Sequence, residues 1–368
     1  MKVAGGHGGA RKESGVDQKK DKQRVQEFAR KIFGLYTSGL LTLMVDIGHK
    51  TGLFEAAAKG PGTSAQIAER AGLDERYVRE WLGAMATGGI VTYEAASRTF
   101  TLPAEHAMCL TGTSSRNLAA GSQGLPMLAK RLPRVVECFR SGGGVPYEEF
   151  RPDFTEAQDA SWRLLYDGLL IKGFLPAAKG LPERLAAGIR VADLGCGTGH
   201  AINLMAREYP KSTFVGYDLG EDAIARARAE ARDMGLTNAS FEVLDATRLP
   251  AEPNFDLIAS FDAIHDQKDP AAVLGRAAAA LARDGIYLMV EPKASSNLED
   301  NIGNPFTPYM YGMSVLHCMT VSLAVGGAGL GTVWGEQTAR RMLADAGFTS
   351  VEVVDAPGPQ NNIYICRR

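Results

Sequence analysis

The chain has few cysteines, few tryptophans and no marked excess of charge of either sign. Its 368 residues include 5 Cys and 3 Trp, and no two cysteines form a CxxC pair. Scattered cysteines in a chain of this size argue against a disulfide framework and against a zinc site, so we expect reduced thiols, a cytoplasmic location and no metal. A formal net charge of −2 gives no electrostatic reason to expect a nucleic-acid partner.

Long hydrophobic runs are missing as well. The richest one, SGLLTLMVDIG, contains Asp46 and is shorter than the roughly 18 to 20 apolar residues that span a bilayer, so we expect no membrane partner. Residues 1–22 carry glycines and charges where a secretory signal needs an apolar centre, which predicts a flexible tail. The remaining chain is long enough for two domains.

The first predicted domain, residues 23–115, is mainly helical. Apolar residues recur at three and four positions up to Gly60, and the next segment predicts a helix, a turn at Gly72, a helix from Asp74 and two strands joined by EAASR. This order is that of a winged helix. In its candidate recognition helix the charges balance, with Asp74, Glu75 and Glu80 against Arg76 and Arg79. That balance favours packing or dimerisation over DNA binding.

Residues 116–188 predict a helical connector that contributes to a substrate pocket, and residues 189–368 predict an α/β domain. From Arg190 onward apolar strands alternate with amphipathic helices, which indicates a mainly parallel sheet covered on both faces. The alternation stops over residues 292–335 and then resumes as helix, strand, strand. We expect that insertion to form a lid over the pocket.

A glycine-rich loop, VADLGCGTGHA, joins the first strand of this domain to its first helix. Glycines at 195, 197 and 199 let a ligand lie against the backbone. A dinucleotide fold would need a sixth-position glycine where this chain has His200. Asp193 would repel a pyrophosphate but help to hold an ammonium or sulfonium ligand through water, which favours S-adenosylmethionine.

Acidic residues follow the next two strands. Asp218, 19 residues beyond Gly199, is placed to accept hydrogen bonds from both ribose hydroxyls, and Asp245 to accept from the adenine amino group with Ala246 behind the ring. The complete set of residues that we expect at the cofactor is Asp193, Gly195, Cys196, Gly197, Gly199, Asp218, Leu219, Asp245, Ala246, Ser260 and Phe261.

With DLGCGTG, YD and LDA in this order, the chain resembles the class I S-adenosylmethionine-dependent methyltransferases over about Arg190 to Arg368. The resemblance implies a Rossmann-like fold with a seven-stranded sheet and S-adenosyl-L-methionine as cofactor. It extends to small-molecule O-methyltransferases that carry a winged-helix-like dimerisation domain in front, and it is closest to their mycobacterial and actinobacterial branch. We therefore expect a homodimer that methylates a small, apolar or aromatic acceptor.

The same resemblance implies a catalytic histidine. In the plant enzymes a fourth strand beginning with aspartate is followed nine residues later by a histidine in an HD pair, and a glutamate ends strand five. Here Asp256 and His265 have that spacing, and Asp266 and Glu291 take the other two places. His265 as a general base held by Asp266 or Glu291 is one interpretation, and a packed loop residue is the other.

The pattern departs from the plant enzymes after the HD pair, where they have tryptophan and this chain has Gln267. Acceptor identity is therefore not transferable. The segment after strand five supplies the residues that we expect at the acceptor: Tyr309, Met310, Met313 and His317. Core packing of that segment, N-, C- or S-methylation, and a winged-helix regulator that senses S-adenosylmethionine all stay open at this point.

Overall fold

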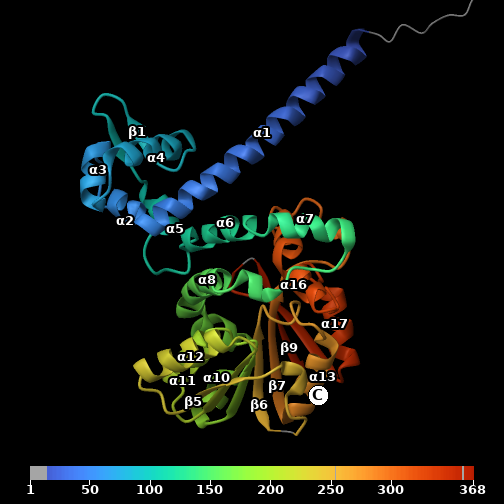
Figure 1. The fold of residues 1–368 in the computed structure, drawn as a ribbon. Helices are drawn as coiled ribbons and strands as arrows, with labels where there is room; N and C mark the ends of the chain where they lie inside the picture. Colours follow the sequence, from blue (N-terminus) through green and yellow to red (C-terminus); the bar gives the residue numbers. More distant parts are fainter. Residues whose placement is uncertain (1–14, 253, 359) are drawn as a thin grey trace, which may run out of the picture. The chain divides into compact units, whose positions relative to one another are not determined.

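The structure, a computed structural model, describes residues 15–252, 254–358 and 360–368 (Figure 1). The chain divides into two compact units, Met1–Pro103 and Ala104–Arg368. The first unit ends at Pro103, whereas we predicted a boundary near residue 115. Helix α1, Gly15–Thr51, begins inside the segment predicted as a tail, whose residues 1–14 lie outside the described part. GVDQKKDK has no apolar periodicity, so no sequence pattern predicts this part of the helix.

The first unit is a winged helix built on well-formed helix ends. Thr63 caps α3 by accepting from Gln66 N, Gly72 ends that helix in the left-handed conformation, and Asp74 caps α4. Ring edges of Phe54 and Trp81 meet in the core, with centroids 5.2 Å apart. After α1 the unit contains α2 Leu53–Ala58, α3 Ser64–Ala71, α4 Glu75–Thr87, β1 Thr92–Glu94 and β2 Thr99–Thr101.

Much of α1 has no packing partner among the described residues. Its apolar side chains Val25, Phe28, Phe33, Tyr36 and Leu40 are each at least 63% exposed. By length and composition alone its segment Lys20–Thr51 would suffice to cross a membrane, although only 11% of the most apolar window is buried. The core helix of a soluble protein or a signal sequence passes the same test, so this is weak evidence for a membrane segment.

The second unit begins with helices that precede the sheet. The longest of them, α8, spans Asp153–Leu169 and continues into a π-helical turn, η3, Leu170–Phe174. The others are α5 Ala104–Leu110, η1 Ala119–Gln123, α6 Gly124–Ala129, α7 Leu132–Ser141, η2 Tyr147–Phe150, α9 Leu175–Ala177 and α10 Leu181–Ala187.

A seven-stranded sheet forms the centre of this unit, in the order β5-β4-β3-β6-β7-β9-β8 (Figure 1). Strand β9 runs antiparallel to both of its neighbours, β7 and β8, and the other neighbouring strands pair in parallel. The chain order reverses at β3, which lies between β4 and β6, and in open α/β sheets ligands bind beyond the carboxyl ends of the strands at such a point. The strands are β3 Arg190–Leu194, β4 Thr213–Asp218, β5 Ala239–Val243, β6 Phe255–Phe261, β7 Leu281–Pro292, β8 Ser350–Asp355 and β9 Asn361–Arg367.

Helices cover both faces of the sheet, as its apolar strands require. One buried cluster joins the sheet to η3, α10, α11 and α12, and the other joins it to α13 and α17. These helices are α11 His200–Glu208, α12 Glu221–Asp233, α13 Pro270–Ala280 and α17 Glu336–Asp345, and the short η4 is Ala246–Arg248. Residues 292–335 form α14 Leu298–Asn301, α15 Thr307–Met313, the π-helical η5 Ser314–Cys318 and α16 Met319–Ala324. The seven-stranded Rossmann-like fold with a helical winged-helix domain in front is confirmed.

Candidate active site

The glycine-rich loop between β3 and α11 turns in a way that only glycine tolerates. Gly195, Gly197 and Gly199 have φ of 74°, 53° and 72°. A Cβ atom on Gly195 would lie 2.7 Å from the Ala263 side chain, and one on Gly199 would lie 2.4 Å from the Phe241 ring. The loop therefore lies close to the segment after β6, and together they enclose space above the sheet.

Asp218 ends β4 at the mouth of this loop. Its Oδ2 accepts a hydrogen bond from Gly197 N at 2.9 Å, and its Oδ1 accepts one from Gly220 N at 2.7 Å. Each carboxylate oxygen keeps a further lone pair for a ligand hydroxyl. The pattern of two fixed oxygens at the end of the second strand is what a ribose diol needs.

Asp193 is 2% exposed and lies beneath the loop, and its Oδ1 has no hydrogen-bond partner among the described residues. Burial, and then the neighbouring Asp218, raise the pKa of Asp193 to about 8. A cation bound above the loop would favour the ionised carboxylate. An orphaned acid in this position therefore fits a sulfonium or ammonium ligand and opposes a pyrophosphate.

A cavity of about 350 Å³ lies above the loop in the second unit. Its lining includes the glycine loop with Asp218, Leu219 and Ala246. Aromatic and apolar side chains line it as well: Tyr147, Phe154, Trp162, Tyr166, Phe261, Val321 and Val325, with His317 among them. Charged side chains, among them Arg151, Asp159, Arg163, Asp262 and Asp266, complete the wall. The cavity therefore offers polar groups for a nucleoside and apolar surface for a second molecule.

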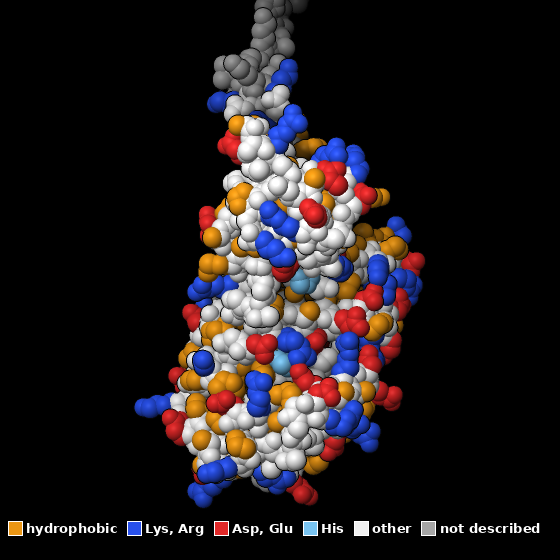
Figure 2. All heavy atoms as spheres, turned by 90° about the vertical axis from the view of Figure 1, so that its left-hand side faces the viewer, with side chains coloured by type: hydrophobic (Ala, Val, Ile, Leu, Met, Phe, Trp, Pro, Cys, Tyr) orange, Lys and Arg blue, Asp and Glu red, His pale blue; other side chains and the backbone are white. Residues whose placement is uncertain are grey.

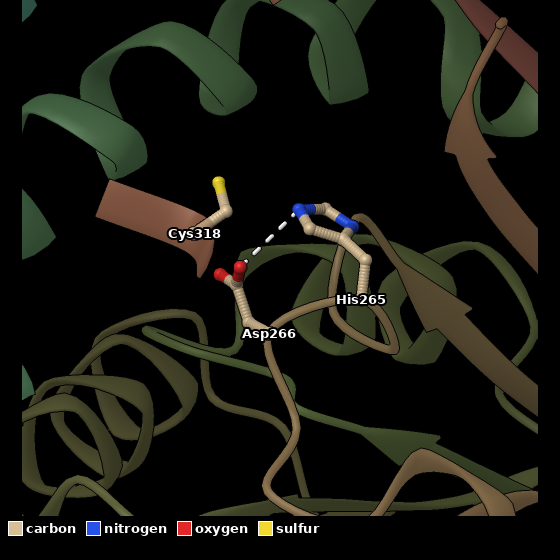
Figure 3. A group of neighbouring side chains, drawn as sticks. All are labelled: His265, Asp266 and Cys318. Atoms are coloured by element: carbon tan, nitrogen blue, oxygen red, sulfur yellow. Dashed lines mark ion pairs between the residues drawn. The ribbon is translucent and has the colours of Figure 1, made fainter. Parts of the chain in front are cut away.

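His265 lies in the loop after β6 and is 1% exposed, and it does not line the cavity. Its Nε2 lies 3.3 Å from Asp266 Oδ1 (Figure 3). Its Nδ1 lies 2.6 Å from Glu291 Oε2. Burial disfavours charge on the ring, but Glu291 and then Asp266 outweigh it and hold the pKa of His265 well above its usual value. Because a carboxylate oxygen only accepts, Nδ1 donates to Glu291, and the raised pKa favours the imidazolium form of the ring.

Glu291, at the end of β7, is closed off from solvent. Besides His265 it accepts a hydrogen bond from Ile264 N at 2.8 Å and one from the Trp334 indole at 3.2 Å. This pattern fixes the loop that carries His265 and accounts for the buried charge.

Figure 3 shows that Cys318, from η5, approaches the same ion pair. Ligand atoms of His265, Asp266 and Cys318 lie within 4.8 Å of one another, a donor set that suits zinc. Burial and then Asp266 raise the pKa of Cys318 to about 12, which keeps the thiol neutral. His265 is already hydrogen-bonded to Glu291 through Nδ1 and lies 3.3 Å from the Asp266 carboxylate, so the arrangement is accounted for without an ion.

His317 has the opposite environment. It lines the cavity and is 1% exposed, and neither ring nitrogen has a hydrogen-bond partner within the described part of the chain. The Phe154 ring stacks on it at 3.7 Å, while Phe150 and Tyr147 meet it edge-on. Burial lowers the pKa of His317 to about 4, so the ring is neutral at physiological pH.

Asp262, between β6 and His265, is a cavity residue that the sequence analysis missed. Its backbone has a φ of 55°, unusual for a residue other than glycine, and its Oδ1 is without a partner among described residues. Burial raises the pKa of Asp262 to about 7, and the nearby His265 charge opposes that rise. Nothing in the sequence around it signalled a left-handed aspartate.

Several predicted residues lie elsewhere. The Asp245 side chain caps η4 by accepting from Thr247 N at 2.9 Å, and it does not line the cavity. Ser260 is buried under the sheet surface, where its hydroxyl pairs with the Tyr287 hydroxyl at 2.8 Å. Of the four predicted acceptor residues, only His317 lines the cavity. Tyr309 is 62% exposed, Met310 is buried, and Met313 packs against the cluster that contains Leu128 and Phe154.

Helix α8 contributes cavity residues that no motif indicated, and a polar network ties it to the loop. Arg163 donates to Glu230 at 2.5 Å and lies 2.7 Å from His200 Nδ1, while His200 Nε2 lies 2.9 Å from Asp167. Asp159 accepts from Thr198. His200, the residue that departs from the dinucleotide pattern, therefore anchors α8 over the loop.

The sheet order, the loop and the acid after β4 define the class I methyltransferase fold and site. Residues 185–347 match the methyltransferase domain family, and residues 39–112 match the Rv2258c-like winged HTH domain. The chain belongs to the S-adenosylmethionine-dependent methyltransferases, whose cofactor is S-adenosyl-L-methionine.

Relatives with known names agree with this membership. Aklanonic acid methyltransferase DauC of Streptomyces sp. (strain C5) is 30% identical over 164 residues, which are 43% of this chain and 74% of that protein. Trans-aconitate 2-methyltransferase of Methylobacterium nodulans is 34% identical over 116 residues, 32% of this chain, and the match spans 42% of its length. Among solved structures, mitomycin 7-O-methyltransferase MmcR has a TM-score of 0.68 at 16% identity, covering 95% of this chain and 99% of that one, a likeness in fold.

Proposed function

We propose that this protein transfers a methyl group from S-adenosylmethionine to a small, apolar or aromatic acceptor, with oxygen as the favoured acceptor atom. The observation that carries the proposal is one cavity whose lining combines the glycine loop and Asp218 with aromatic side chains. Bound there, the cofactor supplies an electrophilic methyl group on a positively charged sulfur.

Different residues of the cavity bind different parts of the cofactor in this proposal. Asp218 holds the ribose, Ala246 and Leu219 flank the adenosine, and Asp193 favours the cationic methionine portion. Gly195, Cys196, Gly197, Gly199 and Phe261 form the wall beside it. Aligning two reactants in a closed site is most of what an in-line displacement requires.

Three further properties belong to the same proposal. The exposed apolar face of α1 supports a homodimer, because monomers seldom expose so much apolar surface in one place. The five cysteines are all free thiols, in keeping with a reducing cytoplasm. On the face shown in Figure 2, basic and acidic side chains are interspersed and neither sign forms a continuous field, in keeping with no nucleic-acid partner.

A regulator that senses S-adenosylmethionine is the competing function. In α4, the candidate recognition helix, Arg76 pairs with Glu80 at 2.6 Å and Arg79 pairs with Glu75, which leaves little positive charge for phosphates. A gel-shift screen with genomic fragments tests it, and we expect no shift at physiological salt.

Product identification tests the function itself. The full chain is incubated with methyl-labelled S-adenosylmethionine and a panel of phenols, carboxylic acids, thiols and amines, and labelled products are identified by mass spectrometry. We expect label in O-methyl products. Cofactor binding without label in any acceptor class would contradict the proposed activity, and label in amines or thiols alone would move the reaction to N- or S-methylation.

A further inference from the structure

We propose that Asp262, Asp266 and His317 bind a protonated amine on the methyl acceptor, while the methyl group goes to an oxygen elsewhere on the same molecule. All three residues line the cavity, and we call them the ammonium subsite. This inference rests on the proposed function of the cavity. It narrows the acceptor class to aromatic compounds that carry both a hydroxyl group and a basic amine.

The charges in this part of the cavity wall do not balance. Ligand atoms of Asp262, His265 and Glu291 lie within 4.8 Å of one another, and Asp266 Oδ1 lies 3.3 Å from His265 Nε2. Even as an imidazolium, His265 supplies one positive charge against three carboxylates. Glu291 accepts hydrogen bonds from the protein, whereas Asp262 Oδ1 and Asp266 Oδ1 have no partner among the described residues. A cationic ligand would compensate these two aspartates.

The Lys and Arg side chains of the cavity lining do not supply the missing positive charge. Arg151 pairs with Asp222, and Arg163 pairs with Glu230 at 2.5 Å. Lys268 is exposed and forms no ion pair within the described parts of the chain. In our proposal the compensating charge therefore comes with the ligand.

His317 gives independent evidence for a ligand at this place. It is 1% exposed, and neither of its ring nitrogens has a hydrogen-bond partner in the part of the chain that the structure describes. Buried polar atoms are nearly always paired, so two unpaired nitrogens on the wall of a cavity indicate a ligand that can hydrogen-bond. Phe154 stacks on the ring and holds it in place. Because burial lowers the pKa of His317 to about 4, one nitrogen keeps a lone pair that can accept.

An ammonium group matches these acceptors. It has three N–H donors, and the acceptors are Asp262 Oδ1, Asp266 Oδ1 and the lone pair of His317. The rings of Tyr166 and Phe261, which meet edge-on at 5.4 Å, line the same cavity, and aromatic faces attract cations. A carboxylate or phosphate on the acceptor would instead be repelled by the two aspartates.

The cofactor also carries positive charge, on its sulfur and on its α-amino group, but another acid is placed for it. Asp193 lies beneath the glycine loop, and Asp218 is the charged neighbour that affects its pKa. The charges that affect the pKa of Asp262 come instead from Glu291 and from the loop after β6. We therefore assign Asp193 to the cofactor and Asp262 to the acceptor.

Binding the amine in its protonated form also decides which atom is methylated. An ammonium nitrogen has no lone pair, so it cannot attack the methyl group. The acceptor oxygen forms a bond to the methyl carbon, the carbon–sulfur bond breaks with its electron pair on sulfur, and the hydroxyl proton is released. Burial raises the pKa of Asp262 to about 7, and a bound ammonium group would favour the ionised carboxylate.

A series of probes that differ in charge gives the first test. With S-adenosylhomocysteine bound, the wild-type protein is titrated in a calorimeter with tyramine, with the neutral 4-(2-hydroxyethyl)phenol and with the anionic 4-hydroxyphenylacetate. We expect tyramine to bind about tenfold more tightly than the neutral phenol, the worth of roughly one charge-assisted hydrogen bond, and the anion to bind most weakly. Equal affinities for the three probes, or tightest binding of the anion, would overturn the proposal.

Asp262→Asn tests the residue itself. The amide keeps the shape of the side chain and removes its charge, so the preference for tyramine over the neutral phenol should fall to near one. Asp284→Asn is the matched control, since Asp284 is exposed and lies outside the cavity lining, and it should keep the wild-type preference. An unchanged preference in Asp262→Asn would overturn the assignment. The probe series on the wild type needs no variant, so the proposal stays testable if Asp262→Asn does not fold.

The same variant separates the acceptor from the cofactor and from a metal ion. We expect Asp262→Asn to bind S-adenosylmethionine and S-adenosylhomocysteine as wild type does. Weaker binding of both would assign Asp262 to the α-amino group of the cofactor, and weaker binding of S-adenosylmethionine alone would assign it to the sulfonium. Titration of wild type with zinc should give no heat that Asp262→Asn abolishes. Each of these contrary results would overturn the proposal.

The labelled products give the last test. Among acceptors in the panel, hydroxylated aromatic amines should be labelled on oxygen and faster than their neutral analogues at equal concentration. Label on the nitrogen of tyramine would overturn the ammonium subsite, and so would equal rates for charged and neutral phenols, while the proposed methyl transfer would stand in both cases. Failure of the proposed function is a different result, because then neither labelled product nor cofactor binding appears.

Discussion

His265 Nδ1 lies 2.6 Å from Glu291 Oε2, and both side chains are closed off from solvent. Removing one partner of such a pair leaves the other charge buried and uncompensated, which costs about 3 to 5 kcal/mol. We therefore expect His265→Asn to lower the free energy of unfolding by about that amount in urea denaturation. Asp266→Asn should cost much less, because the Asp266 side chain is 28% exposed.

The same measurement separates the two interpretations of His265. If His265→Asn melts like wild type while turnover falls by about 10² or more, the general-base interpretation would stand and the packed-residue interpretation would fail. Loss of stability with turnover preserved in the folded fraction is the result that we expect.

Asp218 gives the most direct prediction for the cofactor. Two charge-assisted hydrogen bonds to the ribose, roughly 1.5 to 3 kcal/mol each, are at stake. Asp218→Ala should weaken S-adenosylmethionine binding by about tenfold or more in calorimetry. Asp245→Ala is the comparison, since its side chain caps η4, and we expect a smaller effect. Unchanged affinity in Asp218→Ala would remove the ribose assignment.

The sequence predicts features that depend on neighbouring residues and misses those that depend on packing between distant segments. Alternating apolar strands and amphipathic helices predicted the sheet, and the glycines at 195, 197 and 199 predicted the loop, because both are local patterns. Tyr147 and Phe154 reach the cavity only through the packing of η2 and α8, which no local spacing encodes. Ser260 was misplaced for a related reason, since strand residues alternate faces and its hydroxyl turns to Tyr287.

Asp193 predicts a pH-dependent cofactor affinity. Its folded-state pKa of about 8 lies above the ordinary value of 3.8, so the protonated acid favours the folded state at low pH and this contribution is lost as pH rises through about 8. A bound cation favours the ionised form, so affinity for S-adenosylmethionine should rise from pH 5.5 to pH 7. This range lies below the titration of the ligand's own α-amino group, near pH 8. Proton release in calorimetry with two buffers measures it.

Asp193→Asn should have opposite effects on the stability of the ligand-free protein and on its affinity for the cofactor. The amide removes a buried acid, so the melting temperature of the ligand-free protein should rise at neutral pH. Affinity for the cofactor should fall, and its pH dependence should flatten. Cofactor affinity equal to wild type with the same pH slope would show that Asp193 does not respond to the ligand's charge.

The exposed face of α1 predicts the oligomeric state. Phe28 and Leu40 are each 63% exposed on this face, and burying them against a second copy stabilises a dimer. Light scattering at micromolar concentration should give twice the chain mass of 39.3 kDa, and Phe28→Glu with Leu40→Glu should give the single mass. A monomeric wild type that floats with phosphatidylcholine and phosphatidylglycerol vesicles would instead assign this face to a membrane.

His317 also predicts acid sensitivity of the fold. Its pKa of about 4 in the folded state lies below the ordinary value of 6.5, so an unfolded chain takes up a proton that the folded chain refuses between these values. The contribution is complete above pH 6.5 and is lost as pH falls toward 4, by about 3 kcal/mol over the whole window. Urea denaturation from pH 7 to pH 4.5 should therefore show a shallower loss of stability in His317→Phe than in wild type.

His49→Phe is the control and should follow wild type. The ionisable groups around Asp193 and Asp262 are the same in all three proteins, so their contributions to the pH dependence cancel in the comparison. Parallel pH profiles for wild type and His317→Phe would mean that His317 takes up protons freely in the folded protein, which would contradict its closed surroundings.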